Sequence, residues 1–170
     1  FVNGMVTATK FMGDGSMLTN VAAAEKPALK VVNTRIDFHN GNSAGLNKLL
    51  YTGVVNFNTG AGYSAATRKF VAPVAGRYSF TASQTFTMNC TATNSLLTLV
   101  KNKSLATEET FSAARNQVTT GTCLSNQVVG TVQLDLGDTV EVYYSFVDPA
   151  NNSEWGYYDP AGNFFTGFKI

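Results

Sequence analysis

The chain has 170 residues, only 14% of them charged, and a formal net charge of +1 at pH 7. A length of this order suits one domain around one hydrophobic core. Because the charge is balanced and Lys and Arg are not clustered, we expect no nucleic-acid partner and no binding to anionic membranes. The sequence also has no apolar run of about 18 to 20 residues, so we expect no membrane insertion.

Residues 1–29 differ from the rest and predict a short fibrous stalk. Apolar side chains stand on both sides of the turn-like stretch Gly13-Asp14-Gly15-Ser16, namely Met5, Val6, Phe11, Met12, Met17, Leu18 and Val21. So short a segment cannot bury them alone, whereas identical copies in a closed oligomer can. We therefore predict a trimerisation segment here; the alternative is an unstructured leader. Because the chain begins at Phe1, we expect it to be part of a longer protein.

Residues 30–170 are predicted to form an all-β head. β-branched and aromatic residues alternate with polar ones between Gly, Asn and Pro. The predicted strands are Lys30–Phe38, Lys48–Phe57, Lys69–Ala72, Gly76–Met88, Leu96–Lys101, Thr107–Ala114, Val128–Leu134, Thr139–Phe146 and Phe164–Ile170. Since helical patterns are missing between them, a parallel βαβ fold is excluded. The pattern predicts an antiparallel sandwich or jelly roll of two sheets.

Three stretches of the head resemble the globular head of complement component 1q, which shares its jelly-roll fold with tumour necrosis factor. They are the series Tyr63, Phe70, Pro73, Gly76, Tyr78 and Phe80, then the stretch from Leu134 to Val140, and the closing stretch Phe165 to Ile170. The resemblance covers about residues 30 to 170. It implies an antiparallel two-sheet jelly roll that assembles as a homotrimer.

The stalk carries a second resemblance. The stretch from Ala8 to Asn20, which contains GDGSMLTN, resembles a motif of phage and other viral fibre proteins and of some bacterial surface proteins. In those proteins the motif usually precedes a terminal head. The resemblance therefore implies a homotrimeric viral fibre tip that recognises a host surface.

One long polar stretch, from Asp148 to Asn163, contains the single Trp of the chain and is the candidate binding loop. Aromatic rings stack on sugars while carboxylates and amides accept hydrogen bonds from their hydroxyl groups. This chemistry makes a ligand site of Asn151, Glu154, Trp155, Tyr157, Tyr158 and Asp159. Two alternatives stay open: a calcium site made by Asp148, Glu154 and Asp159, and simple packing of the aromatic residues over the end of the sandwich or across a subunit boundary.

The residues give little support to catalysis. His39 is the only histidine and lies in a turn-like stretch, so neither a zinc site nor a Ser-His-Asp triad is expected. Glu154 and Asp159 resemble a glycosidase pair only in being two carboxylates. We expect no enzyme activity and no cofactor. Cys90 and Cys123 either form a disulfide or are both free.

Together these features predict a non-enzymatic, homotrimeric head of a viral or phage fibre. It would lie on the virion surface and bind a glycan or protein receptor of the host, with three sites acting together. The alternatives are a structural module that only trimerises and assembles the fibre, and a secreted surface protein of the same fold, for example from a bacterium, acting outside the cell.

Overall fold

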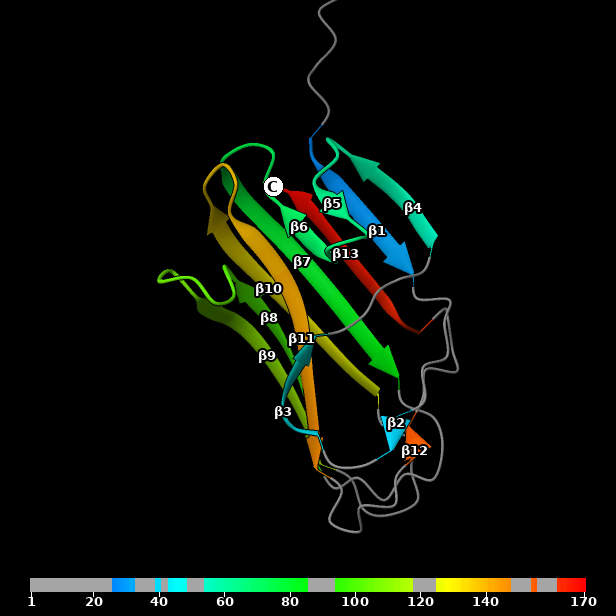
Figure 1. Ribbon diagram of the computed structural model, residues 1–170. Coiled ribbons are helices and arrows are strands. Elements are labelled where there is room, and N and C mark those ends of the chain that lie inside the picture. Colours follow the sequence, from blue (N-terminus) through cyan, green and yellow to red (C-terminus); the bar gives the residue numbers. More distant parts are fainter. Residues whose placement is uncertain are drawn as a thin grey trace, which may run out of the picture.

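The computed structural model describes residues 26–32, 39–40, 43–48, 54–85, 94–117, 125–147, 154–155 and 162–170, and this part of the chain is a sandwich of two antiparallel sheets (Figure 1). The five-stranded sheet has the order β10 (Ser125–Leu134), β7 (Gly76–Thr85), β13 (Phe164–Lys169), β1 (Ala28–Val32), β4 (Val54–Thr59). The other sheet has the order β5 (Tyr63–Ser64), β6 (Lys69–Val71), β11 (Thr139–Val147), β8 (Asn94–Lys101), β9 (Glu109–Gln117), with β3 (Ser43–Lys48) also paired to β11. A short pair joins β2 (His39–Asn40) to β12 (Glu154–Trp155). The predicted all-β, two-sheet jelly roll is confirmed.

The core between the sheets is built around the ring of Phe80. This ring stacks on Phe165 at 5.7 Å between centroids and meets the edge of Phe70 at 5.2 Å, and the Tyr78 ring lies 6.1 Å away. All four side chains are almost completely buried. The alternation of buried and less buried residues along β7 thus places its aromatic residues on the core face, as a period of two requires.

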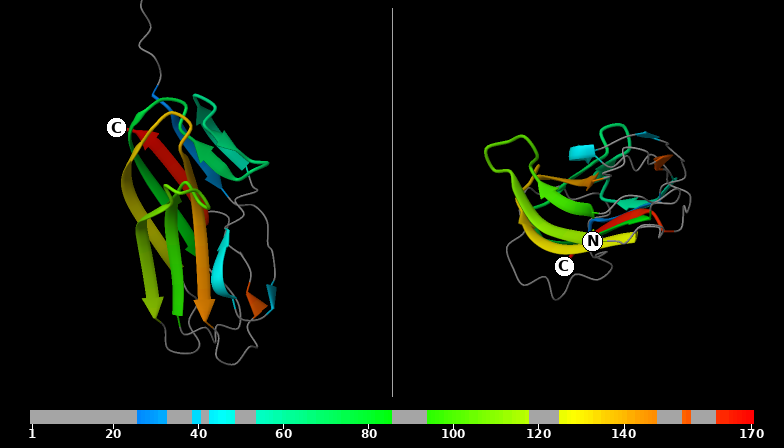
Figure 2. Two further views of the ribbon diagram at one scale, coloured as in Figure 1. Left: turned by 60° about the vertical axis from the view of Figure 1, so that its left-hand side comes forward. Right: turned by 90° about the horizontal axis from the view of Figure 1, so that it is seen from below.

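The two sheets approach each other on the side of β9 and β10, as the view from below shows (Figure 2). The Ser112 hydroxyl on β9 donates a hydrogen bond of 2.7 Å to the Val129 carbonyl on β10. Gly130 allows this close approach, because a Cβ at this position would lie 2.7 Å from Ser112 and 2.9 Å from Phe111. This edge of the sandwich is therefore closed by direct contact between the sheets.

The two ends of the sandwich carry different parts of the chain. At one end β1 begins with Ala28, beside the C-terminus of the chain (Figure 1). At the other end Thr85 pairs with Ser125, and Asn94 pairs with Val147. The connections 86–93, 118–124 and 148–163 therefore all leave the sheets at the end opposite to Ala28.

Candidate functional site

The outer face of the five-stranded sheet carries three rows of residues, each crossing all five strands, and of these residues Ser83 is buried. Its residues alternate with core residues such as Tyr78, Phe80 and Phe165 and therefore point away from the core. In the order β10, β7, β13, β1, β4, the rows are Gln127, Ser83, Phe164, Val32, Val54; Val129, Thr81, Thr166, Lys30, Phe57; and Thr131, Ser79, Phe168, Ala28, Thr59. We call these fifteen residues the open face.

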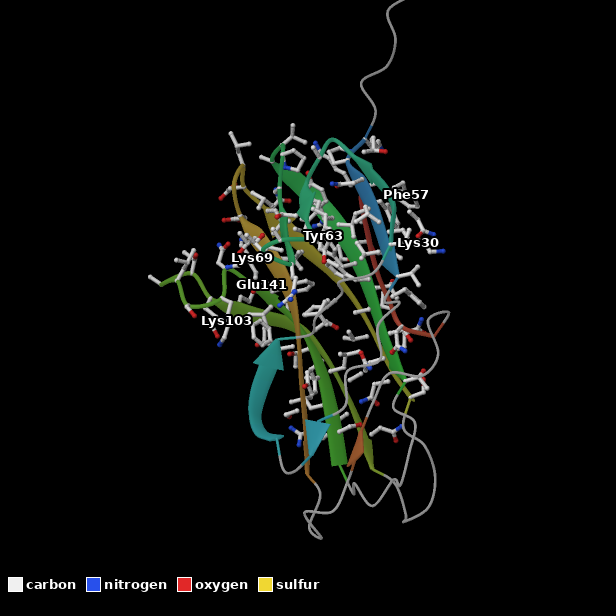
Figure 3. All side chains as sticks on the ribbon, turned by 45° about the vertical axis from the view of Figure 1, so that its right-hand side comes forward. Lys30, Phe57, Tyr63, Lys69, Lys103 and Glu141 are labelled. Atoms are coloured by element: carbon white, nitrogen blue, oxygen red, sulfur yellow. The ribbon has the colours of Figure 1, made fainter. Side chains whose placement is uncertain are left out.

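The open face is apolar and hydroxyl-rich. Val129 is 60% exposed, Val54 59%, Phe168 54% and Phe57 46%. Lys30 is the only charged residue in the three rows; it lies opposite Phe57, and Figure 3 shows the two together. Exposed apolar surface of this extent, with almost no charge, is typical of a surface that another protein covers.

The outer face of the six-stranded sheet is different, because it carries a network of ion pairs. On β11, Glu141 and Tyr143 alternate with core residues and so point outward, yet the Glu141 side chain is only 2% exposed. The Lys69 ammonium group lies 2.9 Å from Glu141 Oε1, and the Tyr143 hydroxyl donates to Glu141 Oε2 at 3.1 Å. Lys103 covers the Tyr143 ring at 5.7 Å and pairs with Glu108 at 2.6 Å. Figure 3 shows Lys69, Glu141 and Lys103 on this side of the head. Each carboxylate here is held by neighbouring cations or donors, which suits a structural network.

The network changes the acidity of its phenol. Burial raises the pKa of Tyr143 to about 12, and the charge and hydrogen bond of Glu141 act in the same direction. Both effects disfavour a phenolate, because ionisation would place a second negative charge beside the carboxylate. Tyr143 is therefore a hydrogen-bond donor at neutral pH.

The predicted loop site lies mostly outside the described residues. Of its members, only the backbone of Glu154 and Trp155 is described: these residues form β12 and pair with Asn40 and His39 of β2. The structure thus pairs His39, the only histidine of the sequence, with Trp155, its only tryptophan, on neighbouring strands. Outside the described residues lie Asp148, Asn151, Tyr157, Tyr158 and Asp159, together with Cys90 and Cys123 and the stalk residues 1–25.

In the described ranges, no group of three or more His, Cys, Asp and Glu side chains is placed to hold a metal ion. The same ranges contain no helix that is long and apolar enough to cross a membrane.

The fold defines the class of protein, a two-sheet jelly roll of the complement 1q and tumour necrosis factor type. The chain belongs to the C1q domain family, since the sequence profile of that family matches residues 36–170. Among solved structures, murine APRIL at pH 5.0 is similar, with a TM-score of 0.64 and 14% identity over 86% of this chain and 100% of that chain. The globular domain of zebrafish complement 1qA has a TM-score of 0.55 and 18% identity over 86% and 98%. At these identities the likeness shows the fold, and no curated protein matches the sequence.

The C1q and tumour necrosis factor resemblance predicted from Tyr63 to Phe80 is thereby confirmed. Domains of this type are typically non-enzymatic, trimeric recognition modules that act outside the cell. The open face was not identified from the sequence. The sequence does contain the pattern of this face, because Thr81, Thr166 and Phe168 alternate with core residues and carry no charge. Only the sheet order shows that these positions lie side by side.

Proposed function

We propose that the chain is the non-enzymatic, homotrimeric head of a viral or phage fibre, lies on the virion surface, and recognises a glycan or protein receptor of the host. The observation that carries the proposal is the open face. An isolated chain would leave Val54, Phe57, Val129 and Phe168 in water, whereas a closed trimer covers them in each subunit.

The positions of the two ends of the sandwich support the recognition role. The chain enters the head at Ala28, and the connection 148–163 leaves the sheets at the opposite end. In a fibre whose shaft precedes residue 28, this connection faces outward, away from the shaft. Three copies around one axis present three loops to a surface, so that weak single contacts add to a strong attachment.

The same open face also supports the alternative of a pure assembly module, in which the head only trimerises the fibre. The two functions share the trimer and differ in whether the distal end binds a ligand. Two experiments therefore test the proposal in sequence.

The first experiment measures the oligomeric state. Light scattering of the purified chain is expected to give three times the chain mass of 18.2 kDa. Phe168→Glu places a charge on the middle strand of the open face and is expected to yield monomers, because burying an unpaired carboxylate is costly. Leu105→Glu is the control: Leu105 is 59% exposed, similar to Phe168, but lies between β8 and β9. A monomeric wild-type chain at micromolar concentration contradicts the proposal.

The second experiment measures recognition with intact trimers. Binding to a glycan array and to host cells is expected for the wild type and to fall at least about tenfold in Trp155→Ala, since aromatic stacking and avidity both contribute. Leu105→Ala is expected to keep full binding. If intact wild-type trimers bind neither glycans nor host cells, the assembly module is the correct alternative.

A further inference from the structure

A second group of exposed apolar side chains lies at the end of the sandwich where the chain enters. Leu136 is 73% exposed, Ile170 55% and Val74 42%. They come from three separate places: the turn between β10 and β11, the C-terminus, and the connection between β6 and β7. We call these three residues the stalk-end rim.

Hydrogen bonds fix the segments that carry the rim. The Ile170 amide donates to the Arg77 carbonyl at 2.9 Å, and the Tyr78 hydroxyl donates to the Val74 carbonyl at 2.8 Å. The turn that carries Leu136 is tied to the β6–β7 connection, because the Gly137 amide donates to the Ala72 carbonyl at 3.0 Å. The three segments that carry the rim residues are thus fixed by hydrogen bonds to the ends of the neighbouring strands.

The rim lies beside the point where the stalk joins the head. The Lys169 amide donates to the Pro27 carbonyl at 2.9 Å, which places Pro27 next to the residue preceding Ile170. From β1, the strand order β13, β7, β10 then leads across Ile170 and Val74 to Leu136, a span of roughly 15 Å at the usual strand spacing. Figure 1 shows the β6–β7 connection, the β10–β11 turn and the C-terminus at the end where β1 begins.

The preceding segment has the composition to cover this surface. Residues 17–24 read Met-Leu-Thr-Asn-Val-Ala-Ala-Ala, with no charge, and they end three positions before Pro27. Eight residues span roughly 26 Å when extended and about 12 Å as a helix, so they can reach across the rim in an extended form or cover most of it as a helix. A tethered segment also loses little freedom on docking compared with a free partner.

We propose that residues 17–24 of this chain dock on the stalk-end rim through their apolar side chains and so fix the direction in which the stalk leaves the head. The occupant is the chain's own segment, and the inference does not depend on the ligand of the distal end. A neighbouring copy on the rim is one of the outcomes that the experiment separates.

The test is hydrogen exchange of the full-length chain, read by mass spectrometry on peptides that cover residues 17–24. In the wild type these amides are expected to exchange slowly. In the double variant Val74→Ser/Leu136→Ser they are expected to exchange at least about tenfold faster, because docking loses the apolar area that drives it. Leu105→Ser removes an equally exposed leucine from another part of the head and is expected to change nothing.

A stalk variant completes the test. Val21→Ser is expected to give the same loss of protection, and combining it with Leu136→Ser is expected to add little, because contacting residues are coupled. Fast exchange in the wild type overturns the proposal. So does protection that survives in the rim variant, since it means that the stalk is held by neighbouring stalks or by another copy. The trimer mass and melting temperature of each variant are measured in parallel, so that a failure of the trimer proposal is seen separately.

Discussion

Gly167 on β13 lies directly opposite Phe80 on β7, and the Phe80 ring occupies the space that a side chain at position 167 would need. A Cβ at position 167 would lie 2.4 Å from two ring carbons of Phe80. The ring cannot move away freely, because Phe165 and Phe70 pack against it. The absence of a side chain at Gly167 is therefore part of the core packing.

We expect Gly167→Ala to lower the free energy of unfolding by about 1–3 kcal/mol through overpacking. Thr166→Ala, one residue earlier on the opposite side of the same strand, is expected to cost much less. Urea unfolding of both variants measures the difference, and equal stabilities would show that the Phe80 ring has room to shift.

Buried tyrosines make the stability sensitive to alkali, and burial raises the pKa of Tyr78 as well as those of Tyr63 and Tyr143. Burial raises the pKa of Tyr63 to about 12 despite the opposing charge of Arg68, and burial with Glu141 raises the pKa of Tyr143 to about 12, from an ordinary value of 10.0. Below pH 10 these phenols are protonated in the folded and unfolded chains. Above pH 10 the unfolded chain releases these protons first, so the stability falls as the pH rises from 10 to 12.

We expect the free energy of unfolding, measured in denaturant from pH 9 to pH 12, to decrease across this window. Tyr143→Phe removes one of these groups and is expected to make the decrease shallower. An unchanged slope in Tyr143→Phe would mean that this phenol ionises as readily in the folded chain as in the unfolded one.

At the scale of elements, one buried side chain joins the β8–β9 connection to the β10–β11 turn. Asn102, with a φ of +51°, donates to Asp138 Oδ1 at 2.8 Å and to Thr107 Oγ1 at 2.9 Å, and accepts from the Thr139 amide at 2.8 Å. Lys101 lies 2.9 Å from Asp138 Oδ2. Burial opposes the ionisation of Asp138, but these hydrogen bonds and the lysine outweigh it and lower its pKa.

We expect Asn102→Ala to destabilise the head by about 1–3 kcal/mol, because buried polar groups lose their partners. Asn102→Asp keeps the size and tolerance of a positive φ but loses the amide donors and places a carboxylate beside Asp138, so it is expected to be at least as damaging at pH 7. Thermal unfolding measures both; an Asn102→Asp variant as stable as the wild type contradicts this account.

The two cysteines lie in connections whose ends are neighbours. Connection 86–93 contains Cys90 and connection 118–124 contains Cys123; the flanking Thr85 and Ser125 hydroxyl oxygens are 3.2 Å apart. We expect the cysteines to pair in an oxidising environment. Thiol labelling of the denatured, unreduced chain should then detect no free thiol, whereas two free thiols would exclude the bond.

The strands could be predicted where the two faces of the sheet differ in polarity, as in β7, whose aromatic core residues alternate with Ser and Thr. Strand β3 could not, because Ser43–Lys48 contains Gly and little apolar surface. Strand β5 has only two residues, and its pairing with β6 gives no periodic signal. Lys69 and Glu141 of the ion-pair network lie far apart in the sequence and meet only through the sheet order.

At the scale of the whole molecule, a trimer held by the open face makes stability depend on concentration. We expect the melting temperature of the wild type to rise by a few degrees for each tenfold increase in protein concentration, since association stabilises by mass action. The Phe168→Glu variant is expected to melt at a temperature independent of concentration. Independence in the wild type would mean that the open face is not covered by another copy under these conditions.

Both described ends of the chain lie at one end of the sandwich, with the C-terminal Ile170 close to Pro27. A tag or fusion partner added after Ile170 would therefore lie beside the point where the chain enters β1. The strand ends that bound the connections 86–93, 118–124 and 148–163 lie at the opposite end and are paired, so the sequences between them can be exchanged with little change to the core. The head is accordingly suited as a display scaffold, in which new specificity is introduced by loop replacement at the end opposite to Pro27 and Ile170.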